Sequence, residues 1–191
     1  MKKGITPLVR AIQHKSPNLT EFFINKGADI NKQDKRGNTP LHAAIQYMEN
    51  HPKIIELIIK KGADINKPNQ YGATPLFCAI QRKNPTIVEL LINYNVDINK
   101  QGSDKYRNES SPLLYAFNNH NQKSIELLIK KGAILNKEEY DRYSPLHLAI
   151  YDKNIELVEF ILKMGVDIET LDHQGHTLKK YFSFHEKSTF L

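Results

Sequence analysis

Eight histidines and a single cysteine are the residues of this 191-residue chain that most readily suggest chemistry. His173 and His176 stand three residues apart on a predicted turn, a spacing at which two imidazoles can share a metal ion. No further residue at a metal-site spacing accompanies them, and the chain contains no CxxC or HExxH motif. We therefore predict no metal site and no cofactor.

Catalytic arrangements are equally hard to assemble. Glu56, Glu89, Glu126 and Glu159 follow one another at nearly regular intervals, which is typical of a solvated helix face rather than of an acid/base pair. The sequence has no Gly-rich phosphate loop and no Ser-His-Asp or Cys-His pattern. The lone Cys78 excludes an internal disulfide and is predicted to be a buried packing group in a protein of a reducing compartment. The sequence thus favours a non-enzymatic function.

A repeated tripeptide accounts for the regular intervals. Thr-Pro-Leu or Ser-Pro-Leu occurs five times, with prolines at Pro7, Pro40, Pro75, Pro112 and Pro145, so that the steps are 33, 35, 37 and 33 residues. A period in this range indicates a solenoid of small stacked units, which offers a long binding surface. Each hydroxyl residue followed by proline is also a helix start, because the side chain can accept an early backbone N–H and proline needs no bond there.

A second marker follows each helix start in fixed phase. It reads GADIN at Gly27–Asn31 and Gly62–Asn66, and its variants occupy Asn95–Asn99, Gly132–Asn136 and Gly165–Glu169. Glycine or asparagine at the head of this marker predicts a left-handed residue that ends a helix. Together with the GNTPLHAA of Gly37–Ala44 and the SPLHLA of Ser144–Ala149, the pattern resembles the ankyrin repeat over residues 4 to about 172.

The resemblance implies an all-α solenoid of stacked helix-turn-helix units with projecting β-turn or hairpin tips, forming a single domain over residues 1–191. We expect repeats at about 1–33, 34–68, 69–105, 106–138 and 139–171, and a partial C-terminal capping repeat at 172–191. Small insertions near Met48 and Glu49, and over about Gly102 to Lys105, are predicted to lengthen loops. His42 and His147 are expected to make structural hydrogen bonds between adjacent units.

Composition adds few constraints. The net charge of +6 suggests nucleic acid or an acidic surface as a partner, but regularly placed aspartates interrupt the positive field and arginine is scarce. Nucleic acid is therefore the less favoured partner. No apolar run is long enough for a membrane span. We expect a cytoplasmic location and a monomeric solenoid. A residue bias typical of AT-rich coding would suit an effector delivered into a host cell.

The predicted function is protein–protein interaction, through the concave face and the tips that ankyrin repeats usually present to a partner. Tyrosine and arginine there are the residues that commonly anchor interfaces. The candidate partner-binding residues are Lys35, Arg36, Asn38, Gln46, Tyr47, Gln70, Tyr71, Gln81, Arg82, Arg107, Asn108, Asn118, Asn119, Tyr140, Asp141, Tyr143, Tyr151 and Asp152. Tyr71 and Tyr143, beside the caps, fit either packing against a neighbouring tip or contact with a partner. Two alternatives remain open, a targeting segment of a larger multidomain enzyme and a basic scaffold that binds nucleic acid.

Overall fold

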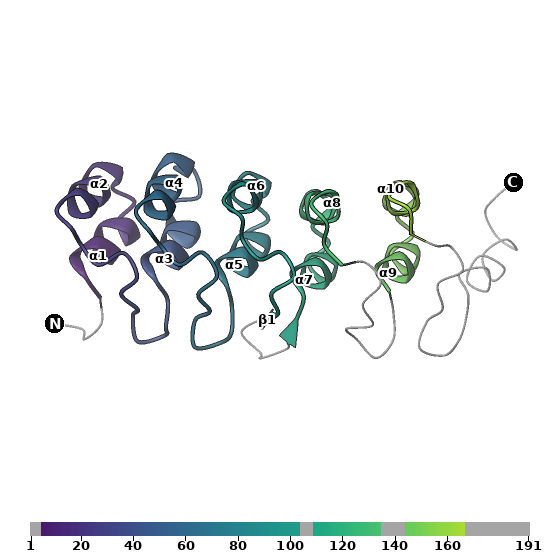
Figure 1. The fold of residues 1–191 in the computed structure, drawn as a ribbon, viewed down its shortest axis with the longest axis horizontal. Helices are drawn as coiled ribbons and strands as arrows, with labels where there is room; N and C mark the ends of the chain where they lie inside the picture. Colours follow the sequence, from purple (N-terminus) through teal and green to yellow (C-terminus); the bar gives the residue numbers. More distant parts are fainter. Residues whose placement is uncertain (1–4, 104–108, 135–143, 167–191) are drawn as a thin grey trace, which may run out of the picture.

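The helices of this protein form two parallel layers. The structure, a computed structural model, describes residues 5–103, 109–134 and 144–166. The inner layer, on the side of the projecting tips, consists of α1 (Pro7–Gln13), α3 (Pro40–Tyr47), α5 (Pro75–Gln81), α7 (Pro112–Asn118) and α9 (Pro145–Tyr151). The outer layer consists of α2 (Pro17–Asn25), α4 (Pro52–Lys60), α6 (Pro85–Asn93), α8 (Gln122–Lys130) and α10 (Ile155–Lys163). Figure 1 shows the five pairs side by side, so the predicted all-α solenoid is confirmed.

The helix boundaries follow the predicted caps. The side-chain oxygens of Thr6, Thr39, Thr74 and Ser111 each accept the backbone N–H three residues further on, at 3.2–3.4 Å. Ser16, Asn84, Asn121 and Asn154 do the same for the outer helices. His51 and Ser144 make no side-chain cap bond, so the predicted cap bond is wrong for Ser144, whose hydroxyl lies against the His147 ring instead. The predicted stops have positive φ angles, namely 80° at Gly27, 89° at Gly62, 57° at Asn95, 90° at Gly132 and 88° at Gly165.

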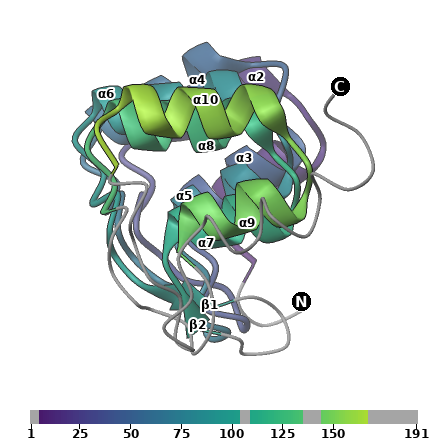
Figure 2. The same ribbon diagram turned by 90° about the vertical axis from the view of Figure 1, so that its right-hand side faces the viewer.

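The core runs between the layers and through all five pairs. A small residue recurs at the same place in every inner helix, and Ala44, Ala79, Ala116 and Ala149 have no exposed surface. This absence of bulk lets neighbouring inner helices approach closely. The leucine of each Pro-Leu pair is buried as well, to 2% exposure or less. Viewed end on, the outer helices lie at the top, the inner helices lie below them, and the tips lie below the inner helices (Figure 2).

A buried histidine joins the second pair to the third. His42 is 3% exposed, and its Nε2 lies 3.0 Å from the carbonyl oxygen of Ala73 in the next unit. Its Nδ1 lies 3.2 Å from the backbone nitrogen of Thr39 and 2.8 Å from the Thr39 hydroxyl. Because the carbonyl needs a donor and the Thr39 N–H needs an acceptor, the ring is neutral with its proton on Nε2. The predicted hydrogen bond between units is confirmed for His42. For His147 it stays a prediction, because the contact of its Nδ1 with the Ser144 hydroxyl, at 2.7 Å, lies within one unit.

Asparagines form a second set of links between units. The side-chain oxygens of Asn31, Asn66 and Asn99 accept the backbone N–H groups of Asp64, Asp97 and Ile134 at 2.8, 3.0 and 3.0 Å. Each acceptor stands in one marker segment and each donor in the next. These asparagines therefore have a structural role that coding bias alone would not reveal.

The two insertions take different forms. The first adds one residue to α3 and places Met48 in the core at 1% exposure, where the Thr20 hydroxyl lies 3.9 Å from its sulfur. The expectation of a longer turn there was incomplete, because the insertion also lengthens the helix. Burial of the apolar Met48 side chain favours this arrangement. The second insertion begins with β1 (Gly102–Ser103), which pairs antiparallel with β2 (Glu109–Ser110), and its remaining residues lie outside those that the structure describes. The predicted C-terminal cap at 172–191 lies outside the described residues.

Candidate partner-binding groove

Each of the first two tips is a tight hairpin held by one polar side chain at its start. Asp34 Oδ1 accepts the N–H groups of Arg36 and Asn38, at 2.8 and 2.9 Å. One unit further, Asn69 Oδ1 accepts those of Tyr71 and Ala73 in the same way, at 2.9 and 3.1 Å. Such short side chains favour turns by this local bonding. The result is that the residues at each apex project from the stack.

Neighbouring tips are also joined to one another. The backbone N–H of Gln70 donates to the Arg36 carbonyl at 3.0 Å, and that of Ser103 donates to the Gly72 carbonyl at 3.1 Å. Gly37, with φ of 74°, lies so close to the next tip that a Cβ there would stand 2.6 Å from the Gln70 nitrogen. The described parts of the first three tips therefore form a continuous wall that faces the inner helices.

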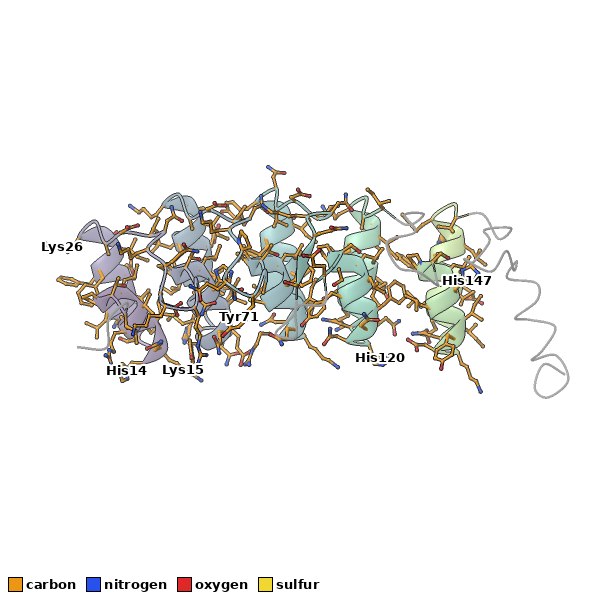
Figure 3. The ribbon with its side chains drawn as sticks, turned by 90° about the horizontal axis from the view of Figure 1, so that it is seen from below. His14, Lys15, Lys26, Tyr71, His120 and His147 are labelled. Carbon is orange, nitrogen blue, oxygen red and sulfur yellow. The ribbon has the colours of Figure 1, made fainter. Side chains whose placement is uncertain are left out.

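A groove lies between this wall and the inner helices, as two hollows of about 360 and 560 Å³ that share Arg36, Asn38 and Gln46. The first is also lined by Ile5, Val9, Gln13, Asp34, Lys35, Ala43 and Tyr47. The second is also lined by Asn69, Tyr71, Ala73, Phe77, Cys78, Gln81, Arg82, Ser103 and Tyr115. Seen from the tip side, Tyr71 lies over the middle of the stack, whereas His14, Lys15 and His120 lie along one edge (Figure 3).

The floor of the second hollow is apolar. Phe77 and Tyr115, on α5 and α7, stack with their ring centroids 4.7 Å apart and 27° between the planes. The small Ala73 and Cys78 line the same hollow. Burial raises the pKa of the Cys78 thiol to about 12, so the sulfur is neutral near pH 7 and acts as an apolar contact. The prediction that Cys78 is buried holds in part, because the residue is only half-buried at the groove.

Four of the predicted binding residues are engaged in bonds within the protein. The Asn38 side chain donates to Asp34 and accepts from Asn69. Arg82 donates to Glu49 of the preceding unit from Nε and from its terminal nitrogen, at 3.3 and 2.9 Å. Two further internal contacts join Asn119 Nδ2 to the Tyr115 carbonyl at 2.7 Å and His120 to Asp152 at 3.2 Å. Because these four side chains bond within the protein, they stabilise the tips and edges of the groove.

The other predicted residues are distributed unevenly. Lys35, Arg36, Gln46, Tyr47, Tyr71 and Gln81 line the groove together with Asn38 and Arg82. Gln70 lies at a tip, and Asn118 and Tyr151 are exposed on inner helices but line neither hollow. Tyr151 is 79% exposed and Tyr71 is 39% exposed, while Tyr47 is half-buried against the core. Arg107, Asn108, Tyr140, Asp141 and Tyr143 lie outside the described residues.

Sequence reasoning missed the floor of the groove. Arg10, Ala43, Cys78, Tyr115 and Leu148 hold the same position in successive inner helices, yet they differ in size and polarity. Variation at a position that the repeat does not dictate was a signal available in the sequence. It was overlooked because the apolar members suggest core packing.

One charged cluster lies on the outer layer, away from the tips. Glu56 Oε1 accepts from Lys60 Nζ at 2.8 Å and from the Tyr94 hydroxyl at 2.7 Å. The hydrogen bond from Lys60, followed by that from Tyr94, lowers the pKa of the Glu56 carboxyl. A carboxylate held ionised in this way fits a solvated helix face. Nowhere in residues 5–103, 109–134 and 144–166 do three His, Cys, Asp or Glu side chains meet as metal ligands would.

Comparison with known families agrees with this architecture. A family model described as ankyrin repeats, in three copies, matches residues 8–102 and 101–172. The chain belongs to the ankyrin-repeat family. Ankyrin repeats are generally protein–protein interaction modules, and proteins built from them are typically non-catalytic. A comparison with curated proteins found no match for this ankyrin-repeat chain. None of the helices described is both long enough and apolar enough to cross a membrane.

Proposed function

We propose that this ankyrin-repeat protein binds a partner protein through the groove between its tips and its inner helices. The observation that supports the proposal most strongly is the continuity of the groove. Two hollows that share Arg36, Asn38 and Gln46 extend from α1 to α7, and therefore cross four of the five helix pairs. A surface of this length suits an extended segment or a protein face better than a small molecule.

The side chains at the groove support the same proposal. Arg36, Gln46, Tyr71 and Gln81 are exposed, and no hydrogen bond or ion pair ties their side chains to another described residue. Tyrosine and arginine bury a large area for little lost conformational freedom, and glutamine can both donate and accept. These four side chains are therefore available for hydrogen bonds and packing contacts with a partner.

The test compares two triple variants in affinity capture followed by mass spectrometry. In the groove variant, Arg36, Gln46 and Tyr71 are replaced by alanine. In the matched control, the exposed Lys53, Glu89 and Lys123 of the outer helices are replaced instead. Because interface anchors carry most of the binding energy, we expect the groove variant to retain about a tenth of the captured partner or less.

The control variant should recover the partner as the unmodified protein does, and both variants should keep the melting temperature of the parent. Equal recovery by the groove and control variants, with the fold intact, would remove the groove from the function. Loss of the partner in the control alone would assign binding to the outer layer.

A further inference from the structure

We propose that the groove takes an extended protein segment in which acidic residues flank an aromatic or branched aliphatic side chain. The proposal rests on the proposed function, since it names the chemistry of the segment that the same groove binds. Three features of the described residues carry it, namely the charge at the first tip, the apolar floor and a pair of amides.

The described residues that line the groove carry a net positive charge, from Lys35, Arg36 and Arg82 against Asp34. Lys35 and Arg36 occupy the apex of the first tip, both exposed, and their side chains have no bonded partner among the described residues. The neighbouring Asp34 carboxylate is already occupied, because its two oxygens accept two backbone N–H groups and the Asn38 amide. Among the described residues that line the two hollows, Asp34 is the sole carboxylate. An anionic group of a partner would therefore find unsatisfied donors at Arg36.

The apolar floor calls for a different group next to the charge. Ala73 and Cys78 are small, and the stacked rings of Phe77 and Tyr115 stand beside them in the same hollow that Arg36 lines. An aromatic or branched side chain placed here would gain burial against carbon and a neutral thiol. The two preferences together require an acidic residue close in sequence to an apolar one.

The amides set the backbone conformation of the segment. Gln46 and Gln81 occupy the same position in α3 and α5, seven residues after the N-cap in each case, and both are exposed at the groove. Each amide offers donors and an acceptor, as does each peptide unit of an extended chain. Two amides on successive helices can therefore bond to the backbone of one extended segment, without dependence on its side chains.

The observations favour a protein segment over nucleic acid. Recognition of a phosphate backbone requires cations repeated along the strand. Here the apex position that holds Arg36 in the first tip holds Tyr71 in the second, because Asp34 and Asn69 start equivalent turns. Among the described residues that line the groove, the cations without an ion pair are thus Lys35 and Arg36 of the first tip, and Arg82 further along is already paired with Glu49.

The experiment selects displayed random peptides of about 12 residues, which span about 40 Å when extended, on the purified protein. The same selection is run on Arg36→Glu and on the matched control Lys123→Glu, which makes the same charge change on the exposed face of α8. We expect the unmodified protein and the control to enrich peptides with Asp or Glu beside an aromatic or aliphatic residue. A fluorescent copy of the best peptide should bind Arg36→Glu about tenfold or more weakly, since attraction becomes repulsion.

The possible outcomes separate this proposal from the proposed function. Enriched peptides that are neutral or basic, but that lose binding to Gln46→Ala and Tyr71→Ala, would overturn the acidic–apolar occupant and leave the groove as the binding site. If no peptide binds, and the groove variant captures as much partner as the unmodified protein does, both proposals fail. Arg36-dependent binding of a uridine oligonucleotide in the absence of peptide binding would assign the groove to nucleic acid. Thermal melting of Arg36→Glu checks that its fold is intact.

Discussion

Replacing His42 by leucine should destabilise the protein by breaking the link between the second and third helix pairs. The fourth pair carries leucine at this position, Leu114, so the change suits the helix itself. The ring bonds that are lost leave the Ala73 carbonyl and the buried Thr39 N–H without their partners. Each unsatisfied group costs about 1–3 kcal/mol, and the apolar leucine offsets part of this, so we expect a loss of about 2–4 kcal/mol.

The loss at His42 should depend on pH. Burial lowers the pKa of His42 and outweighs the opposing effects of the Ala73 carbonyl and of Asp34 and Asp64. The unfolded chain takes up the proton near pH 6.5, whereas the folded chain resists it, so this contribution to stability is present above that pH and is lost as the pH falls. The gap between parent and variant should shrink below pH 6.5, by at most about 1.4 kcal/mol per pH unit.

Urea unfolding followed by circular dichroism at pH 7.5 and pH 5.5 measures both effects. His51→Leu is a suitable control, because His51 is exposed and makes no cap bond. Equal stability of His42→Leu and the parent at pH 7.5, or a gap that widens in acid, would refute the assignment of a neutral, doubly bonded ring.

Three other expectations concern single positions. Asn66→Ala removes the bond to the Asp97 N–H and should lower the free energy of unfolding by about 0.5–1.5 kcal/mol in urea titration; no loss would show that this link is dispensable. Lys83 has φ of 53°, so Lys83→Gly should raise the melting temperature through a gain of about 0.5–1 kcal/mol, and a lower melting temperature would contradict relief of strain. The Cys78 thiol, with its pKa of about 12, should react with iodoacetamide at pH 8 at least about a hundredfold more slowly when folded than in urea, as mass spectrometry can follow; equal rates would refute the raised pKa.

The sequence was sufficient for the helices and for most of their ends, because these depend on local chemistry. The Thr39 side chain caps α3 by accepting a backbone N–H three residues away. Gly62 ends α4 because glycine adopts the left-handed conformation at low cost. The groove was predicted less completely, because its chemistry depends on contacts between units. Nothing local to Arg82 predicts its bond to Glu49, 33 residues away, and nothing local to Tyr115 predicts its stacking on Phe77.

The asparagine links bear on how the stack responds to load. Each joins one unit to the next and none spans two junctions, so tension applied along the long axis passes through the junctions in series. A small rotation at each junction then adds up to a change in overall curvature while every helix pair stays whole. The protein should therefore behave as an elastic strip, which can adjust its bend to the shape of what it holds.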